Sequence, residues 1–354
     1  MKRVLLTGGG GFVASHTLIH LLHNTDWEII CTDSFRHRGK TDRIAEMVNG
    51  HPEYWPRVTV LTHDLTVPFS EQFIAKLGRV DYIISMASES HVDRSISDPR
   101  PFIENNVALT LTLLEYARYC NICEGIHPPN ANHDPDYMVE KFLNISTDEV
   151  YGPAYGEHGH VEGEPHKPSN PYSASKAAQE DFCYSYWRTY SLPIIIINCM
   201  NMFGELQDTE KLIPRTIKYA MSGETLPIFA NKDKTAAGTR KYIHARNFSD
   251  ALLFTLNNVE PANYLSGDKE IQRLNVVGDK EISNLDMALL VASFTGKKLN
   301  YELADVYGQR PGHDFRYALD GRKLAKLGWK TPLGFEDSVK SVVEWSIAHP
   351  EWLL

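Results

Sequence analysis

The chain has 354 residues, of which 42% are hydrophobic and 23% charged, a composition that supplies a large buried core. Its net charge of −9 argues against a nucleic-acid partner, and no run approaches the ~20 consecutive apolar residues of a membrane span. The five cysteines, an odd number, indicate reduced thiols and a cytoplasmic location. Cys120 and Cys123 form a single C-x-x-C pair with no second pair beside it, so we expect no metal site.

The N-terminal segment is typical of a dinucleotide site. An apolar run at Val4–Leu6 predicts a short buried strand, the glycines Gly8–Gly11 follow it, and a helical pattern covers Ser15–Leu22. Glycines in this place let the backbone approach a pyrophosphate, which binds at the helix N-terminus where free N–H groups point toward it.

The residue at the end of the second predicted strand bears on the choice of cofactor. That strand, Glu28–Thr32, ends at Asp33, about 20 residues beyond the glycines. A carboxylate there accepts hydrogen bonds from the adenosine ribose and repels a 2′-phosphate, which favours NAD. Arg36 and Arg38 follow closely and have the charge that favours NADP. The prediction is therefore NAD, with NADP as the alternative.

Strand and helix patterns alternate through roughly the first 200 residues. Such alternation predicts an α/β fold, a Rossmann-type doubly wound parallel sheet, joined here by a smaller, mixed α/β substrate-binding domain. Further strands are predicted at Val58–Thr62, Tyr82–Met86, Lys141–Ser146 and Pro193–Asn198, and the clearest helices at Phe102–Tyr119 and Tyr172–Tyr190.

Ligands of such sheets bind beyond the carboxyl ends of the strands. The segments predicted at these ends are Gly8–Gly11, Asp33, Asp64, Ala87–Ser90 and Thr147–Glu149. We predict a cofactor-binding domain over residues 1–197, with segments at about 240–272 and 337–354 returning to it. The substrate-binding domain is predicted over residues 198–239 and 273–336, and residues 121–139 are expected to form a protruding loop.

Two clusters of reactive side chains stand out in the first predicted domain. Thr147, Asp148 and Glu149 come directly after an apolar, strand-like run, and Tyr172 and Lys176 share one face of a predicted helix. A lysine and a positive nicotinamide ring both favour the phenolate of a tyrosine. A hydroxyl, an acid pair and a tyrosine–lysine pair are the groups needed to combine alcohol oxidation with elimination of water.

Several segments resemble the motifs of one family. Thr7–Ala14 is similar to the glycine motif of the extended short-chain dehydrogenase/reductase superfamily, except that Ala14 replaces its last glycine. Ser88–Ile96, with the sequence S-E-S-H-V-D-R-S-I, and Thr147-Asp148-Glu149 resemble the dTDP-glucose 4,6-dehydratases within it, and the similarity runs nearly end to end. Epimerases of the superfamily usually carry small or apolar residues in place of Asp148 and Glu149, so the acid pair discriminates between the two reactions.

The resemblance implies a hydro-lyase that converts a nucleotide-diphosphate hexose, most readily dTDP-glucose, into its 4-keto-6-deoxy derivative. By this resemblance, Tyr172 removes the proton of the 4-hydroxyl while NAD takes the hydride from C4, and Thr147 bonds the 4-oxygen. Glu149 then removes the C5 proton, protonated Asp148 donates to the departing C6 hydroxyl, and the hydride returns to C6. Opposite protonation states in adjacent carboxyls require different environments.

The resemblance also implies the binding residues. Those for NAD are Gly8, Gly11, Phe12, Val13, Asp33, Asp64, Leu65, Ala87, Ser88, Tyr172 and Lys176. Those for the substrate are Ser90, His91, Thr147, Asn201, Lys211, Leu212, Pro227, Phe229, Arg240, Asn275, Arg310 and His313. Arginine suits a diphosphate because its planar guanidinium binds phosphate oxygens in pairs.

Departures from the family pattern leave the nucleotide and the sugar open. Met200, Met202 and Glu205 interrupt its S-N-N-Y-G-P segment, and Lys241 and Asn247 stand where acids are usual. The alternatives are a UDP- or CDP-sugar 4,6-dehydratase, or a nucleotide-sugar 4-epimerase or decarboxylase of the same superfamily. A more remote alternative is an NAD-sensing protein without catalysis.

The two long predicted helices also indicate a homodimer. Phe102–Tyr119 and Tyr172–Tyr190 carry more apolar and aromatic residues than one buried face requires, and related enzymes pair through these helices in a four-helix bundle. The residues that suggest this excess are Leu109, Leu113, Tyr116, Tyr184 and Trp187. The alternative is that they pack on the chain's own sheet.

Overall fold

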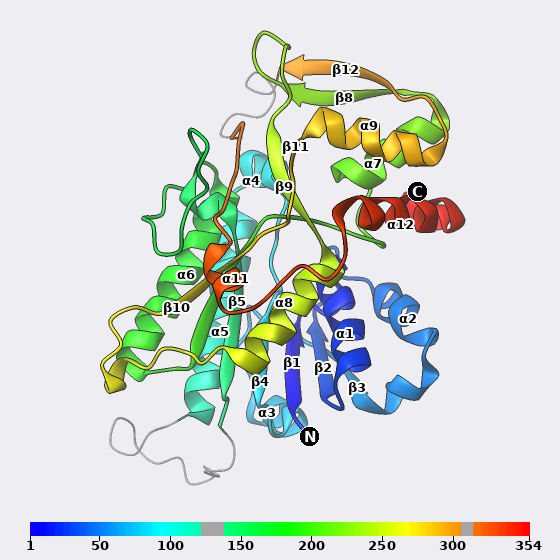
Figure 1. The fold of residues 1–354 in the computed structure, drawn as a ribbon. Coiled ribbons are helices and arrows are strands. Elements are labelled where there is room, and N and C mark those ends of the chain that lie inside the picture. Colours follow the sequence, from blue (N-terminus) through cyan, green and yellow to red (C-terminus); the bar gives the residue numbers. More distant parts are fainter. Residues whose placement is uncertain (122–137, 306–313) are drawn as a thin grey trace. The chain divides into compact units, whose positions relative to one another are not determined.

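The computed structural model describes residues 1–121, 138–305 and 314–354 (Figure 1). The strands are β1 (Arg3–Thr7), β2 (Glu28–Asp33), β3 (Val58–Thr62), β4 (Tyr82–Ser85), β5 (Lys141–Thr147), β6 (Ile194–Cys199), β7 (Asn201–Phe203), β8 (Thr225–Ala230), β9 (Thr239–His244), β10 (Gln272–Val276), β11 (Glu281–Ser283) and β12 (Asn300–Asp305). Within the described ranges, no helix is long and apolar enough to cross a membrane.

The α-helices are α1 (Phe12–Asn24), α2 (Thr41–Asn49), α3 (Glu71–Leu77), α4 (Val92–Ser97), α5 (Arg100–Cys120), α6 (Pro171–Tyr190), α7 (Leu212–Ser222), α8 (Ala245–Asn258), α9 (Asn284–Thr295), α11 (Arg322–Lys326) and α12 (Phe335–Ala348). Short 3₁₀ helices are η1 (Pro52–Arg57), η2 (Asp148–Tyr151), η3 (Tyr264–Ser266) and η4 (Pro350–Leu353).

A seven-stranded sheet, in the order β10-β6-β5-β4-β1-β2-β3, forms the centre of the α/β fold and confirms the predicted fold class. The pairs β1–β2, β1–β4, β2–β3 and β4–β5 are all parallel. Every residue of β4, β5 and β6 is buried. Such strands read as continuous apolar runs because both faces of a parallel sheet are covered. The predicted strands and helices of the first 200 residues are therefore confirmed. Of the loop predicted over residues 121–139, residues 122–137 lie outside the described residues.

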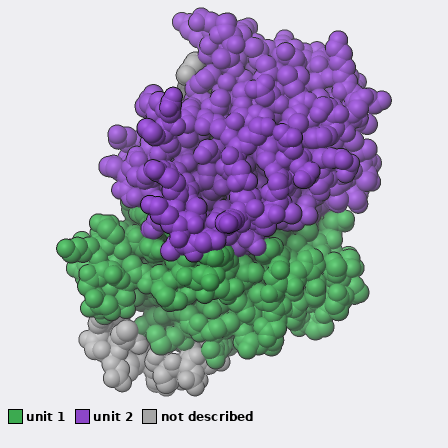
Figure 2. Space-filling model, viewed as in Figure 1, with its two compact units in different colours: residues 1–147, 171–198, 252–274 green, residues 148–170, 199–251, 275–354 purple. Residues whose placement is uncertain are grey.

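The described chain divides into two compact units (Figure 2). Unit 1 contains residues 1–147, 171–198 and 252–274, and unit 2 contains residues 148–170, 199–251 and 275–354. The chain passes from unit 1 to unit 2 at the peptide bond between Thr147 and Asp148, and it returns between Asn170 and Pro171.

The core of unit 2 corrects the predicted domain boundaries. Val339 and Val343 of α12 are fully buried in one cluster with Ile217 of α7 and Met287 and Val291 of α9. Residues 337–354 therefore belong to unit 2 and do not return to the first domain. Residues 148–170, predicted in the first domain, and 240–251, predicted to return to it, also belong to unit 2.

The helices predicted to form a dimer, α5 and α6, pack against each other and against the sheet of unit 1. Four of the five residues that suggested an apolar excess are buried in that core, namely Leu109, Leu113, Tyr116 and Trp187, whereas Tyr184 is partly buried at its edge. These residues therefore pack on the chain's own sheet, which is the alternative to an excess available for a dimer interface. Other apolar side chains of these helices face outward, since Ile103, Leu111 and Phe182 are 52%, 39% and 36% exposed.

Candidate active site

The glycine loop after β1 allows close approach of the backbone. Gly8 has a φ of +70°, and a Cβ at this position would lie 2.9 Å from the Cα of Ala87. Gly11 precedes α1 and gives it no side-chain cap. The first backbone N–H groups of the helix, those of Phe12 and Val13, therefore have no partner within the helix. A loop without side chains that leads into such a helix end fits a dinucleotide pyrophosphate.

The carboxylate of Asp33, at the end of β2, lies beside this loop. Its Oδ2 accepts a hydrogen bond from the backbone N–H of Gly10 at 3.1 Å, and its Oδ1 accepts one from Phe35 at 2.9 Å. The structure thus brings together the glycine loop and the acid that the sequence assigns to the adenosine ribose. This arrangement fits NAD.

Asp64, which follows β3, forms an ion pair with Arg36. The Nη2 of Arg36 lies 2.7 Å from the Oδ2 of Asp64. Although burial opposes the effect, hydrogen bonds from Thr66 and the charge of Arg36 hold the pKa of Asp64 below its usual range. Arg36, whose charge favoured NADP, is therefore offset by a carboxylate. Leu65 is buried in the core of unit 1.

The loop after β4 contains four further predicted residues. The backbone N–H of Ala87 donates to the Oγ1 of Thr7 at 3.2 Å, and the Ser88 hydroxyl donates to the carbonyl of the next residue at 3.1 Å. Ser90 is exposed. His91 caps α4, because its Nδ1 accepts the backbone N–H three residues ahead at 3.2 Å. The cap fixes the start of the helix.

Tyr172 and Lys176 lie in the first half of α6, and both are buried. The backbone N–H of Tyr172 donates to the Ser95 hydroxyl at 3.1 Å. The Nζ of Lys176 donates to the carbonyl of Ile145 at 2.6 Å. Ile145 belongs to β5, the strand that ends at Thr147. Unit 1 therefore holds the tyrosine–lysine helix against the strand that carries the threonine.

The acid pair lies in unit 2, in η2. Asp148 is buried, with 4% of its surface exposed. The Oε2 of Glu149 accepts hydrogen bonds from the Nδ2 of Asn170 at 3.1 Å and from the Tyr317 hydroxyl at 3.3 Å. Two donors on one oxygen fix the orientation of the Glu149 carboxylate.

Burial raises the pKa of Glu149 above its usual range, while hydrogen bonds from Asn170 and Tyr317 and the charges of Arg240 and Lys211 oppose that rise. A carboxylate with a raised pKa is a stronger base, which suits proton abstraction near neutral pH. Burial also raises the pKa of Tyr317, with the Glu149 charge adding to the effect, so this hydroxyl remains protonated and able to donate.

Sequence reasoning missed Asn170 and Tyr317 as neighbours of the acid pair. Asn170 stands two residues before Tyr172, in a P-S-N-P segment read only as a helix start, and Tyr317 stands three residues after the R-P-G-H-D segment. Both positions adjoin motifs that the family resemblance had singled out. Their proximity to these motifs was the signal in the sequence that could have identified them as site residues.

Arg240, which is predicted to bind the substrate diphosphate, is buried, and its guanidinium is hydrogen-bonded to backbone carbonyls. Its guanidinium donates to the carbonyls of Thr239, Phe315 and Asp314 at 2.6, 2.7 and 2.7 Å. It also lies 4.4 Å from the ring centre of Tyr317. Arg240 therefore fixes the segment that brings a tyrosine to the acid pair. Its contact with a diphosphate stays a prediction.

Other predicted substrate residues surround α7 and β8 in unit 2. Asn201 begins β7 and is exposed, and Lys211 directly precedes Leu212, the first residue of α7. Pro227 and Phe229 are half-buried on one face of β8, while Leu226, Ile228 and Ala230, which alternate with them, are buried on the other. A half-exposed proline–phenylalanine face is compatible with a nucleotide base, a role that stays a prediction.

Asn275, Arg310 and His313 complete the predicted set. Asn275 is fully buried, and its Nδ2 donates to the carbonyls of His160 and Asp320 at 3.0 and 3.1 Å. It therefore joins two loops of unit 2. Arg310 and His313 lie outside the described residues.

Two residues that depart from the family pattern, Glu205 and Asn247, interact with other residues of unit 2. Glu205 forms an ion pair with Arg246 at 2.7 Å, and its Oε2 lies 3.2 Å from the Nε2 of His244. Asn247 exchanges two hydrogen bonds with the backbone of Leu333, at 2.9 and 3.1 Å. Each departure thus makes contacts within unit 2.

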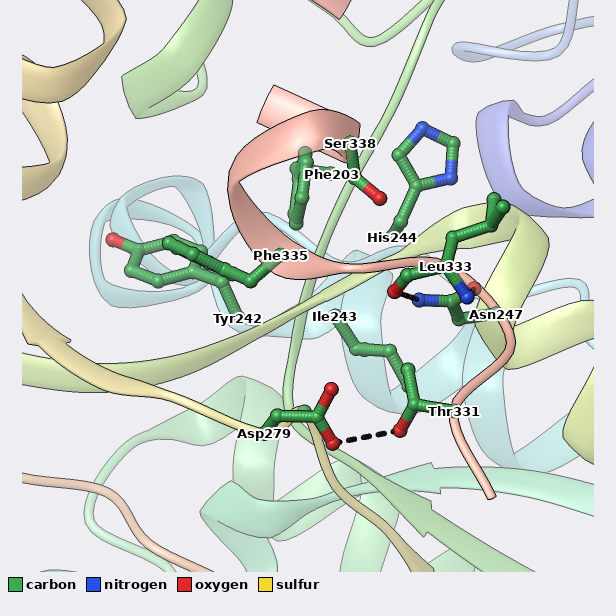
Figure 3. A pocket seen from close by; sticks show the side chains of 11 residues that line it. Phe203, Tyr242, Ile243, His244, Asn247, Asp279, Thr331, Leu333, Phe335 and Ser338 are labelled. Atoms are coloured by element: carbon green, nitrogen blue, oxygen red, sulfur yellow. Dashed lines mark hydrogen bonds between the residues drawn. The ribbon is translucent and has the colours of Figure 1, made fainter. Parts of the chain in front are cut away.

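Asn247 and Leu333 also line a small pocket of unit 2, beside Asp279 and Thr331, whose side chains hydrogen-bond at 2.8 Å (Figure 3). Among the residues that the structure describes, no predicted site residue lines this pocket.

Comparison with known proteins agrees with this chemistry. Residues 5–342 match the family model described as GDP-mannose 4,6 dehydratase. A dTDP-glucose 4,6-dehydratase of Shigella flexneri is 32% identical, over 99% of this chain and 94% of that protein. A probable dTDP-glucose 4,6-dehydratase of Sinorhizobium fredii is 34% identical over the same shares.

Solved structures give the same answer. DesIV, a dTDP-glucose 4,6-dehydratase from Streptomyces venezuelae crystallised with NAD, matches with a TM-score of 0.79 and 30% identity, over 99% of this chain and 98% of that chain. The sheet, the glycine loop and the tyrosine–lysine helix define an enzyme of the short-chain dehydrogenase/reductase type. Within that class, the chain belongs to the GDP-mannose 4,6 dehydratase family, and its predicted resemblance to dTDP-glucose 4,6-dehydratases is confirmed.

Replacing Glu149 with Gln should stabilise the protein near pH 7 and have little effect near pH 4. Because burial raises the pKa of Glu149 in the folded state, the folded protein holds this proton more tightly than the unfolded chain does. Ionisation above the unfolded pKa of about 4.3 therefore lowers stability, and an amide escapes this penalty. Thermal unfolding midpoints measured across this pH range test the prediction.

The control for this experiment is Glu224→Gln, because Glu224 is exposed. Its unfolding midpoint should follow that of the parent at every pH. A Glu149→Gln variant that is less stable than the parent near both pH values would contradict burial as the main influence on Glu149.

Proposed function

We propose that this protein is a nucleotide-sugar 4,6-dehydratase that converts dTDP-glucose into dTDP-4-keto-6-deoxyglucose. The observation that carries the proposal is the acid pair Asp148–Glu149, with Glu149 buried and held by two donors. The relatives named dTDP-glucose 4,6-dehydratase, which cover 99% of the chain, support the substrate. The intact Thr147, Tyr172 and Lys176 support an active enzyme.

NAD, when bound, would accept a hydride from C4 of the hexose and later return it to C6, while a proton returns to C5. The residues proposed to hold this cofactor are the glycine loop, the N-terminus of α1, Asp33, Asp64 and the Tyr172–Lys176 pair. The steric room at Gly8 and the position of Asp33 support this assignment. So does the NAD in the structure of DesIV.

The oxidation half of the reaction is assigned to residues of unit 1. Tyr172 takes the proton of the 4-hydroxyl as a phenolate, and the ammonium group of Lys176 favours that phenolate electrostatically. Thr147 donates a hydrogen bond to the 4-oxygen. The product of this step is a 4-ketone, which acidifies the proton on C5.

The elimination half is assigned to unit 2. Glu149 removes the C5 proton, and the electron pair of that bond forms the C5–C6 double bond as the C6–oxygen bond breaks. Asp148 donates a proton to the departing hydroxide, which leaves as water. The raised pKa of Glu149 supports its role as the base.

Product analysis tests the overall reaction. Incubation with dTDP-glucose should yield a nucleotide sugar lighter by the mass of one water, with no net accumulation of NADH, because the hydride taken from C4 goes back to C6. Mass spectrometry and absorbance at the NADH maximum measure the two quantities, with UDP- and CDP-glucose as comparison substrates. A product of unchanged mass would indicate an epimerase, loss of carbon dioxide a decarboxylase, and stoichiometric NADH a simple dehydrogenase.

Amide variants of the acid pair should stop the reaction after its first half. Asp148→Asn cannot supply the proton that the C6 hydroxyl needs, and Glu149→Gln cannot accept the C5 proton. Each should slow turnover by ~10²–10⁴-fold, while bound NADH appears on mixing with substrate and persists. Stopped-flow absorbance measures this signal.

Two further variants serve as controls for that experiment. Tyr172→Phe should show little NADH, and the exposed Glu224→Gln should turn over at the parent rate. Parent-rate turnover by Asp148→Asn would refute its role as the acid.

We also propose that the protein is a homodimer paired through α5 and α6. Ile103 and Leu111, on α5, and Phe182, on α6, are exposed apolar side chains of the two helices, and such patches often mark interfaces. Light scattering should give twice the chain mass of 40.1 kDa at micromolar concentration. Phe182→Arg should increase the monomer fraction, whereas Leu265→Arg, at a 68% exposed site in η3, should not. A monomeric parent would contradict the proposal.

A further inference from the structure

We propose that Glu180 is a positioning residue for the oxidation at C4. In this role it fixes α6, which carries Tyr172 and Lys176, against the end of β5, which carries Thr147. The inference rests on the proposed function for its substrate. It does not depend on the elimination step, because oxidation at C4 also begins the alternative epimerase reaction.

Glu180 lies on the same face of α6 as the tyrosine and the lysine. Tyr172, Lys176 and Glu180 are spaced by four residues, which places them in one row along a helix. The carboxylate is fully buried. Its Oε1 accepts hydrogen bonds from the Ser146 hydroxyl and, at 2.7 Å, from the Nδ2 of Asn198. Glu180 thus joins α6 to β5 and β6, all within unit 1.

These contacts lead directly to Thr147. Ser146 is the residue before it, and the Nδ2 of Asn198 also donates to the Thr147 carbonyl at 3.2 Å. The backbone of Thr147 is therefore held on both sides by groups that bond Glu180. A side chain on a strand end fixed in this way has little freedom to change its distance from α6.

Lys176 provides a second connection between the same two elements. Its Nζ donates to the carbonyl of Ile145, the residue before Ser146. One turn further along α6, Glu180 bonds Ser146 itself. Consecutive residues of β5 are thus tied to consecutive turns of α6. Without the Glu180 hydrogen bond to Ser146, the Lys176 hydrogen bond to Ile145 is the one of these two that remains. The helix can then shift along the strand.

A buried carboxylate needs a compensating charge. Arg273 of β10 forms an ion pair with the Oε2 of Glu180, and the two side chains are 13% and 0% exposed. Burial and the Glu180 charge raise the pKa of the nearby Cys183 thiol, whereas Arg273 and Lys176 oppose the rise. Both cations therefore act on the same buried region as Glu180. Because Arg273 occupies Oε2, the bonds that position Thr147 depend on Oε1.

The experiment compares two double variants that differ in one property. Arg273→Met with Glu180→Gln removes the ion pair but keeps an amide oxygen that can accept from Ser146 and Asn198. Arg273→Met with Glu180→Leu has a side chain of similar size that accepts nothing. Steady-state rates with dTDP-glucose and with its C4-deuterated form, thermal unfolding, and NAD affinity from tryptophan fluorescence are measured for both proteins and the parent.

The Gln variant should turn over within about threefold of the parent, and the Leu variant should lose about 10–100-fold in kcat, because small misplacements of reacting groups have effects of that size. The KM of the Leu variant should stay within about threefold, since bound substrate is still recognised elsewhere. Its C4-deuterium isotope effect on kcat should increase, because the oxidation becomes rate-limiting. A general loss of folded protein would lower kcat without changing the isotope effect.

Ser146→Ala gives an independent test if the Leu variant fails to fold, because it deletes one of the two donors with the loss of a single atom. It should slow kcat in the same direction by a smaller factor and also increase the isotope effect. Equal kcat and equal isotope effects for the Gln and Leu variants would overturn the proposal. So would loss of NAD affinity in the Leu variant alone, which would make Glu180 a support of the cofactor site.

If the parent makes no dehydrated product but does interconvert C4 epimers, the proposed function fails while this comparison remains valid. The isotope effect reports the oxidation in either reaction. The two failures are therefore distinguishable.

Discussion

A parallel sheet that is buried on both faces leaves only the ends of its strands for polar chemistry. In this protein β4, β5 and β6 have no exposed residue. The glycine loop follows β1, Asp33 ends β2, and Thr147 ends β5, so these three polar segments of unit 1 lie where a buried strand stops. The proposed oxidation depends on this constraint, because it fixes the end of β5, to which Lys176 of α6 is hydrogen-bonded.

The parts of the fold that could be predicted are those specified by neighbouring residues. Four consecutive isoleucines at 194–197, all fully buried, identify β6 without any knowledge of its partners. The glycine loop is similar, because its conformation depends on the absence of side chains at Gly8 and its neighbours. The acid pair was found from its position directly after an apolar, strand-like run, whereas the separate roles of Asp148 and Glu149 came from the resemblance to a family.

The features that escaped prediction depend on residues far apart in the chain. The hydrogen bond between Tyr317 and Glu149 spans 168 residues, and the contact between Arg273 and Glu180 spans 93. Nothing local marks either pair, since a tyrosine after a loop and a glutamate on a helix are common. The sequence also does not show that α12 belongs to unit 2. Its valines could pack in either core, and their contacts with α7 and α9 are seen only in the structure.

The positions at which the chain crosses between the units have a consequence for modularity. The crossing after Thr147 and the return before Pro171 divide the proposed chemistry cleanly: oxidation residues precede and follow the two junctions, while the acid pair and Asn170 lie between them. Exchange of every segment of unit 2, namely residues 148–170, 199–251 and 275–354, would replace the acid pair together with Tyr317 and would retain Thr147, Tyr172 and Lys176. The residues proposed for oxidation and those proposed for elimination therefore lie in different units of one chain. Under the proposed function, a change confined to unit 2 would alter what happens to the 4-ketone and would leave the residues that make it unaltered.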